Sequence, residues 1–93
     1  MGRGSQSKPA RLSEKLLHIR KGLGLSQNGL IRHMGLAEVL TQAEISAFER
    51  SIRVPSLPVL LEYAKAAGVY IDWLVDDDLD LPKKIPARFR QVK

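Results

Sequence analysis

The segment that decides the fold is TQAEISAFER, residues 41–50. Thr41 and Glu44 are spaced as a capping box, in which each side chain binds a backbone N–H of the other residue, so a helix begins after Thr41. Apolar residues then recur at helical spacing and predict the buried face: Ile45, Phe48 and Ile52. The remaining side chains face outward, among them Ser46, Ala47 and Arg50. Pro55 ends the helix, because the residue before a proline disfavours the helical conformation.

Two helices are predicted before this segment. Leu12–Lys21 carries an apolar stripe and ends at the glycines of positions 22 and 24. Gln27–Met34 has Ser26 as its N-cap and Gly35 as its stop. The extended turn that follows, residues 35–41, contains the short apolar run Leu36–Leu40.

Two more helices are predicted after Pro55. Ser56 caps the first, Pro58 lies in its first turn, where the missing N–H costs nothing, and Gly68 ends it. Its buried stripe is predicted to be Leu57, Leu60, Leu61, Ala64 and Ala67. A short helix, Ile71–Val75, follows. Because no segment alternates with the period of a strand, the sequence predicts an all-α, compact five-helix bundle.

Length and charge limit the possible functions. The chain of 93 residues fits one domain, and the absence of cysteine excludes disulfides and thiolate chemistry. The net charge of +5 is distributed unevenly. Residues 1–9 are predicted to be a disordered basic arm, 10–81 the folded domain and 82–93 a basic tail. We expect a polyanion to contact one face and the tails, or the tails to serve solubility alone.

The candidates for other kinds of site are weak. His18 and His33 have no partner at metal-ligand spacing and are predicted to be surface or packing residues. Asp76–Asp80 lacks the pattern of a calcium loop and is predicted to be a solvated acidic terminus. Three aromatic side chains are expected in the core: Tyr63, Tyr70 and Trp73. No catalytic motif and no membrane segment is found, so we expect no enzyme, no cofactor, no metal and no membrane contact.

Two short helices joined by a turn and backed by a third have the arrangement that places one exposed helix in the major groove of DNA. The sequence also carries a family pattern, in the pieces Leu25–Gln27, Ile45–Arg50, Val54–Leu57, Leu60–Leu61, Ala64–Val69 and Ile71–Leu74. With these pieces in this order, the stretch from Leu12 to Asp78 resembles the Cro and phage-repressor (Xre) type of helix-turn-helix domain, which implies a lambda-repressor-like fold. The sequence departs from the family pattern in the longer turn at 35–41, in Ser51 where glycine is usual, and in Ile31 where the family has a small residue.

The resemblance implies which residues contact DNA. In the family, the glutamine at the position of Gln27 binds a phosphate and braces the recognition helix. The side chains implied to lie nearest the bases are Gln42, Ala43, Glu44, Ser46 and Ala47. For Glu44 the cap is favoured over a base contact. The side chains implied to contact phosphates are Arg20, Lys21, Ser26, Gln27, Asn28, Arg50 and Arg53.

The function implied by the resemblance is sequence-specific binding of double-stranded DNA by a cytoplasmic transcriptional regulator, a repressor that occupies its operator as a homodimer. A second hypothesis belongs to another class. The protein would be an interaction module, such as an antitoxin or adaptor, whose protein partner binds the apolar run Leu36–Leu40 and the basic tail. The two hypotheses are compatible, because an antitoxin often binds its own promoter.

Overall fold

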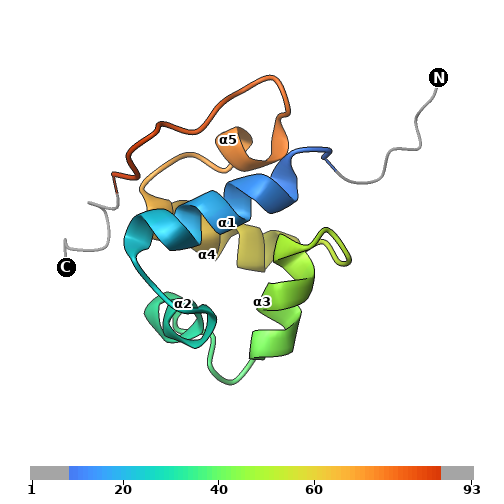
Figure 1. Cartoon of the computed structure of the whole chain (residues 1–93), viewed down its shortest axis with the longest axis vertical. Coiled ribbons are helices and arrows are strands. Elements are labelled where there is room, and N and C mark those ends of the chain that lie inside the picture. Colours follow the sequence, from blue (N-terminus) through green and yellow to red (C-terminus); the bar gives the residue numbers. More distant parts are fainter. Residues whose placement is uncertain (1–8, 87–93) are drawn as a thin grey trace.

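Five helices follow one another in the computed structural model, which describes residues 9–86 (Figure 1). They are α1 (Leu12–Leu23), α2 (Gln27–Met34), α3 (Gln42–Glu49), α4 (Leu57–Ala67) and α5 (Asp72–Val75). No strand occurs between residues 9 and 86. The predicted all-α fold is therefore confirmed, and the five helices follow in the expected order.

The helices pack around α1. This helix contacts α3, α4 and α5, and α2 contacts both α3 and α4. In Figure 1, α5 lies on one side of α1, whereas α2 and α3 project from the other side. Each helix supplies at least one large, fully buried side chain to the common core: Leu16, Ile19, Leu30, Ile45, Tyr63 and Leu74. Burying a side chain of this kind contributes about 1.5–3 kcal/mol, so the core holds all five helices in one unit.

The end of α1 differs from the prediction. The helix continues through Gly22 to Leu23, and Gly24, with φ of 72°, is the residue that ends it. Gly22 instead makes room for the side chain of Ile85. A Cβ atom at position 22 would lie 2.5 Å from Ile85 Cγ1, which is too close. Ile85 is only 8% exposed. The packed part of the molecule therefore extends past Leu81, where the tail was expected to begin, and the remaining tail residues lie outside the described range.

Several apolar residues expected in the core are exposed. Ile52 is exposed because α3 ends at Glu49 and Ser51 turns the chain with φ of 63°, well before Pro55. Leu57, at 68% exposed, and Leu61 face solvent on α4. The buried residues of α4 are Val59, Leu60, Tyr63, Ala64, Ala66 and Ala67. Tyr70 is also exposed, whereas Trp73 packs against the core as predicted.

The acidic end of the domain is exposed at Asp76, Asp78 and Asp80, as predicted, but it also makes specific contacts with α1 that the sequence did not indicate. The Asp77 carboxylate accepts hydrogen bonds from the backbone N–H groups of Ala10 at 2.8 Å and Arg11 at 3.0 Å. Asp77 thus caps α1, whose own N-cap residue makes no side-chain cap. Lys15 is 3% exposed, and its Nζ donates to three backbone carbonyls: those of Trp73, Asp76 and Leu79. These contacts fasten residues 73–79 to α1.

Replacing Asp77 with Asn tests this cap. Bonds from the backbone of Ala10 and Arg11 hold the pKa of Asp77 below its ordinary value. The ionised carboxylate therefore stabilises the fold above about pH 4, the ordinary aspartate value. That contribution is lost as the pH falls through the lower pKa of the folded state. We expect D77N to unfold at a lower urea concentration than the unchanged chain at pH 7, and the difference to shrink toward about pH 2.

The matched control is Asp78→Asn, because the exposed Asp78 side chain accepts none of the bonds at the start of α1. Urea unfolding followed by circular dichroism at the two pH values measures the effect. A difference between D77N and the unchanged chain that stays the same in acid would contradict the cap, as would an equal loss in D78N.

Candidate nucleic-acid interface

The extended turn between α2 and α3 is folded compactly. The backbone N–H groups of Val39 and Leu40 both donate to the Leu36 carbonyl at 2.9 Å. Leu40 is buried and Leu36 is packed against the core, so Ala37 and Val39 are the exposed apolar side chains of the run. Figure 1 shows α2 almost end-on while α3 lies in the plane of the picture. The two helices therefore cross steeply, as a helix-turn-helix requires.

The start of α3 has the predicted capping box. The Glu44 backbone N–H donates to Thr41 Oγ1 at 3.3 Å, and the Thr41 N–H donates to Glu44 Oε1 at 3.0 Å. The other carboxylate oxygen of Glu44 lies 3.6 Å from Arg53. Both oxygens of Glu44 are engaged within the protein, which agrees with the preference for its capping role over a base contact.

The outward face of α3 is formed by four residues: Gln42, Ala43, Ser46 and Arg50. Gln42, Ala43 and Arg50 are exposed, and Ser46 is half-buried and accepts a hydrogen bond from Arg50 Nε at 3.1 Å. Ala47 was placed on this face by the sequence but is only 8% exposed. The cause is that α3 packs against both α1 and α2, which makes its buried side wider than the stripe of Ile45 and Phe48.

A polar network joins α1, α2 and α3 behind this face. Arg20 donates through Nε to Glu49 Oε2 at 2.6 Å and through Nη2 to Glu49 Oε1 at 3.0 Å. Gln27 Nε2 donates to the same Oε1 at 3.0 Å, and Gln42 Nε2 donates to Gln27 Oε1 at 3.1 Å. The bond to Glu49 raises the pKa of Arg20. The network therefore runs from a scaffold arginine to the first side chain of α3.

The network changes the role of two residues. Arg20 was expected to contact a phosphate, but its guanidinium also donates to the Leu25 carbonyl at 3.0 Å and is only 17% exposed. Its hydrogen bonds are directed into the protein. Glu49 was not predicted as a site residue. One signal was present, because a carboxylate in the last turn of a helix meets an unfavourable dipole and needs a cationic partner.

Gln42 keeps the groups that base recognition requires. Its amide has two N–H donors and a carbonyl acceptor, and one N–H binds Gln27. The remaining N–H and the carbonyl oxygen match N7 and the N6 amino group of adenine. The side chain is thus both braced and able to make two further hydrogen bonds.

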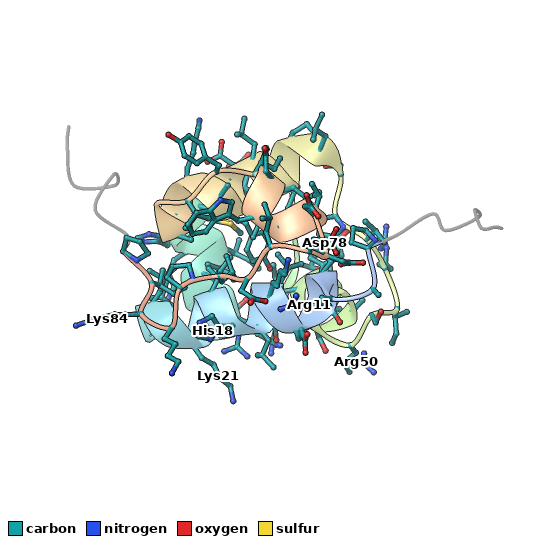
Figure 2. All side chains as sticks on the ribbon, turned by 90° about the horizontal axis from the view of Figure 1, so that it is seen from above. Arg11, His18, Lys21, Arg50, Asp78 and Lys84 are labelled. Atoms are coloured by element: carbon teal, nitrogen blue, oxygen red, sulfur yellow. The ribbon has the colours of Figure 1, made fainter. Side chains whose placement is uncertain are left out.

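Cationic and polar groups surround α3. Lys21, Arg50 and Arg53 are exposed, and Figure 2 shows Lys21 and Arg50 projecting from the same side of the molecule. At the start of α2, Ser26 Oγ accepts from the Gly29 N–H at 2.9 Å, which confirms the predicted cap, and Asn28 is exposed. A helix N-terminus favours anions, so these groups can bind phosphates on either side of a duplex groove.

Other kinds of site were sought over residues 9–86. Within that range no group of three or more His, Asp or Glu side chains is placed to hold a metal ion. His18 is exposed, and its Nε2 lies 3.2 Å from the Pro82 carbonyl oxygen. Of the helices in this range, none is long and apolar enough to cross a membrane.

Comparison with known proteins supports the interpretation of the α2–α3 unit. The family model described as helix-turn-helix matches residues 16–74, which is more than half of the chain. Searches among curated proteins and solved structures gave no significant match. The matched range begins within α1 and ends within α5, so it includes the whole network described above. The chain therefore belongs to the Cro and phage-repressor (Xre) type of helix-turn-helix domain, a family that binds DNA.

Proposed function

We propose that the protein is a transcriptional regulator that binds double-stranded DNA sequence-specifically with α3 in the major groove, and that it represses by occupying its operator. The observation that carries the proposal is the braced Gln42 on the outward face of α3, held through Gln27 and Glu49. A prepositioned amide loses little freedom when it pairs with a base, which favours discrimination between bases.

The small side chains beside Gln42 support the same proposal. Ala43 and Ser46 let the axis of α3 come close to the base edges, and the methyl group of Ala43 can contact a thymine methyl group. Ala47 and Glu44 contribute less, because Ala47 is buried and the carboxylate of Glu44 caps the helix. In this proposal Gln42 provides most of the base recognition, and the neighbouring small residues provide access.

Phosphate contacts would set the orientation of the domain on DNA. We assign them to Lys21, Arg50 and Arg53 and to the start of α2, where Ser26 and Asn28 lie beside the free N–H groups of the helix. Gln27 is engaged with Glu49 and Gln42 but keeps one N–H for a phosphate. Arg20 is assigned to the brace.

We further propose that two copies act together. A single α3 with one strong base-pairing side chain reads few base pairs, and a homodimer doubles this number by placing two such helices in successive major grooves, about 34 Å apart. An operator with twofold symmetry is the expected consequence. Such a regulator acts inside the cell, where its DNA is.

The alternative, a protein-interaction module such as an antitoxin or adaptor, has less support. Its surface was expected at Leu36–Leu40 and the basic tail, but within the apolar run Leu40 is buried and Leu36 packs against the core. Ala37, Glu38 and Val39 are exposed in the same turn, and an alanine and a valine beside a carboxylate give little area for a protein partner.

Selection of bound DNA from a random pool, followed by affinity measurements at several salt concentrations, tests the proposed function. A recurring motif with twofold symmetry is expected. If the dimer makes 6–10 phosphate contacts, affinity falls by about 10³–10⁵ between 50 and 200 mM salt. The absence of a recurring motif, or binding that is independent of salt, would overturn the proposal.

Replacing Gln42 with Ala is expected to relax the base preference at one position of each half-site. A good bidentate pair contributes about 1–3 kcal/mol of discrimination between bases. The binding free energy for the selected sequence should weaken by this amount and approach the value for sequences that differ at this one base pair. Repeating the selection with Q42A measures the change. The assignment of α3 would be wrong if the selected motif were unchanged.

Replacing Arg53 with Gln is expected to weaken binding to all sequences alike, because a phosphate contact carries no sequence information. The slope of log affinity against log salt should become shallower by about one for each protomer. Lys65→Gln on α4 is the charge-matched control, since Lys65 and Arg53 are both exposed and each pairs at 3.6 Å with a glutamate. An effect of R53Q on base preference would contradict its assignment.

A further inference from the structure

After α5 the chain returns along α1. Figure 1 shows this segment, coloured orange to red, passing from α5 toward the C-terminal end of α1. Here residues 79–86 are called the C-terminal strap. The strap forms no helix or strand, so it has no regular backbone hydrogen bonds of its own. Its course must be fixed by contacts with α1.

Three contacts spaced along α1 fix the strap. Near its start, Lys15 Nζ donates to the Leu79 carbonyl at 2.7 Å. At the middle, His18 Nε2 lies 3.2 Å from the Pro82 carbonyl oxygen. At the far end, Ile85 is buried over Gly22. A Cβ atom at position 22 would lie too close to the Ile85 side chain, so glycine fits there. The contacts follow one face of α1, since residues 15, 18 and 22 are spaced by three and four.

The last contact determines where the two lysines of the strap lie. Lys83 and Lys84 precede Ile85 and are exposed, while Lys21 precedes Gly22 and is exposed as well. The Ile85–Gly22 contact thus fixes the backbone of Lys83 and Lys84 beside the C-terminal end of α1, where Lys21 lies. In Figure 2 the labelled Lys21 and Lys84 both project outward from this end. None of the three lysines has an ion-pair partner among the described residues.

This cluster of like charges is continuous with the interface proposed above. The C-terminal end of α1 leads within a few residues to Ser26 and the N-terminus of α2. Both features attract anions, one through lysine charge and the other through free N–H groups.

We propose that Lys21, Lys83 and Lys84 form a second phosphate-binding site, which extends the contact with one DNA strand beyond α2 and depends on the docked strap. The inference rests on the proposed function, because it names further contacts of the same interface. The site recognises the phosphate backbone of duplex DNA and contributes affinity without base preference.

The first test replaces both strap lysines, K83Q/K84Q, in the full chain with residues 87–93 retained. Affinity for the selected duplex is measured across a salt series. The slope of log affinity against log salt is expected to become shallower by about one for each lysine and protomer, with the base preference unchanged. The single variant K84Q is measured as well. Its control is Lys65→Gln on α4, which also removes one positive charge.

The second test replaces Gly22 with Ala. The added methyl group would lie 2.5 Å from Ile85 Cγ1 and 3.2 Å from its Cβ, so Ile85 must shift and the contact that docks the strap on α1 is disturbed. Alanine is the better helix former, so α1 itself is not weakened, and circular dichroism checks this. G22A is expected to make the salt slope shallower although every lysine is still present.

The outcomes separate the two proposals. If the unchanged chain binds its selected duplex with a steep salt dependence and either K83Q/K84Q or G22A keeps the full slope, the second phosphate site is overturned and the proposed function stands. If the unchanged chain shows no salt-dependent, sequence-specific binding, the proposed function fails and this site fails with it. The second site is supported if the salt slope becomes shallower in K83Q/K84Q, in K84Q and in G22A, while the slope of K65Q stays equal to that of the unchanged chain.

Discussion

The arrangement of α3 relative to α1 and α2 depends on one carboxylate, that of Glu49. Its two oxygens accept hydrogen bonds from Arg20 on α1 and Gln27 on α2, while its backbone belongs to α3. A largely buried carboxylate is costly unless it is paired, and removing one partner of a buried ion pair costs about 3–5 kcal/mol, whereas replacing both with apolar groups is often neutral. We infer that this pair serves mainly to fix the orientation of α1, α2 and α3 relative to one another, and adds little net stability. Gln27 in turn positions Gln42 through its hydrogen bond.

A second set of polar contacts closes the opposite side of α1. The Nζ of Lys15 donates hydrogen bonds to three backbone carbonyls in α5 and the residues after it, and Asp77 caps the start of α1. The same helix thus holds α3 through Arg20 near its C-terminal end, and it holds residues 73–79 through Lys15. This division explains why the charges of α1 serve different purposes: Arg20 and Lys15 bond within the protein, and Lys21 faces solvent.

Local sequence signals predicted the helices well. Capping residues and glycine stops depend on hydrogen bonds over a few residues, so the capping box at Thr41 and Glu44 was recognised without tertiary information. Burial was predicted less well. Ile52 fits the spacing of α3, but Ser51 adopts a positive φ and ends the pattern first. Leu57 and Leu61 match a helical stripe as well as the residues that are buried, because spacing alone does not say which face of α4 meets its neighbours.

By itself, the sequence determined the all-α class, the order and approximate ends of the helices and the family to which the domain belongs. These follow from periodicity, caps and motif spacing, which are properties of neighbouring residues. Only the tertiary structure decided that Arg20 binds Glu49, that Ala47 turns inward, that Asp77 caps a helix more than sixty residues earlier and that Ile85 fills the space above Gly22. The physical reason is that a side chain's partner is set by which surfaces meet when the core closes, and residues far apart in the chain carry no local signal of that meeting.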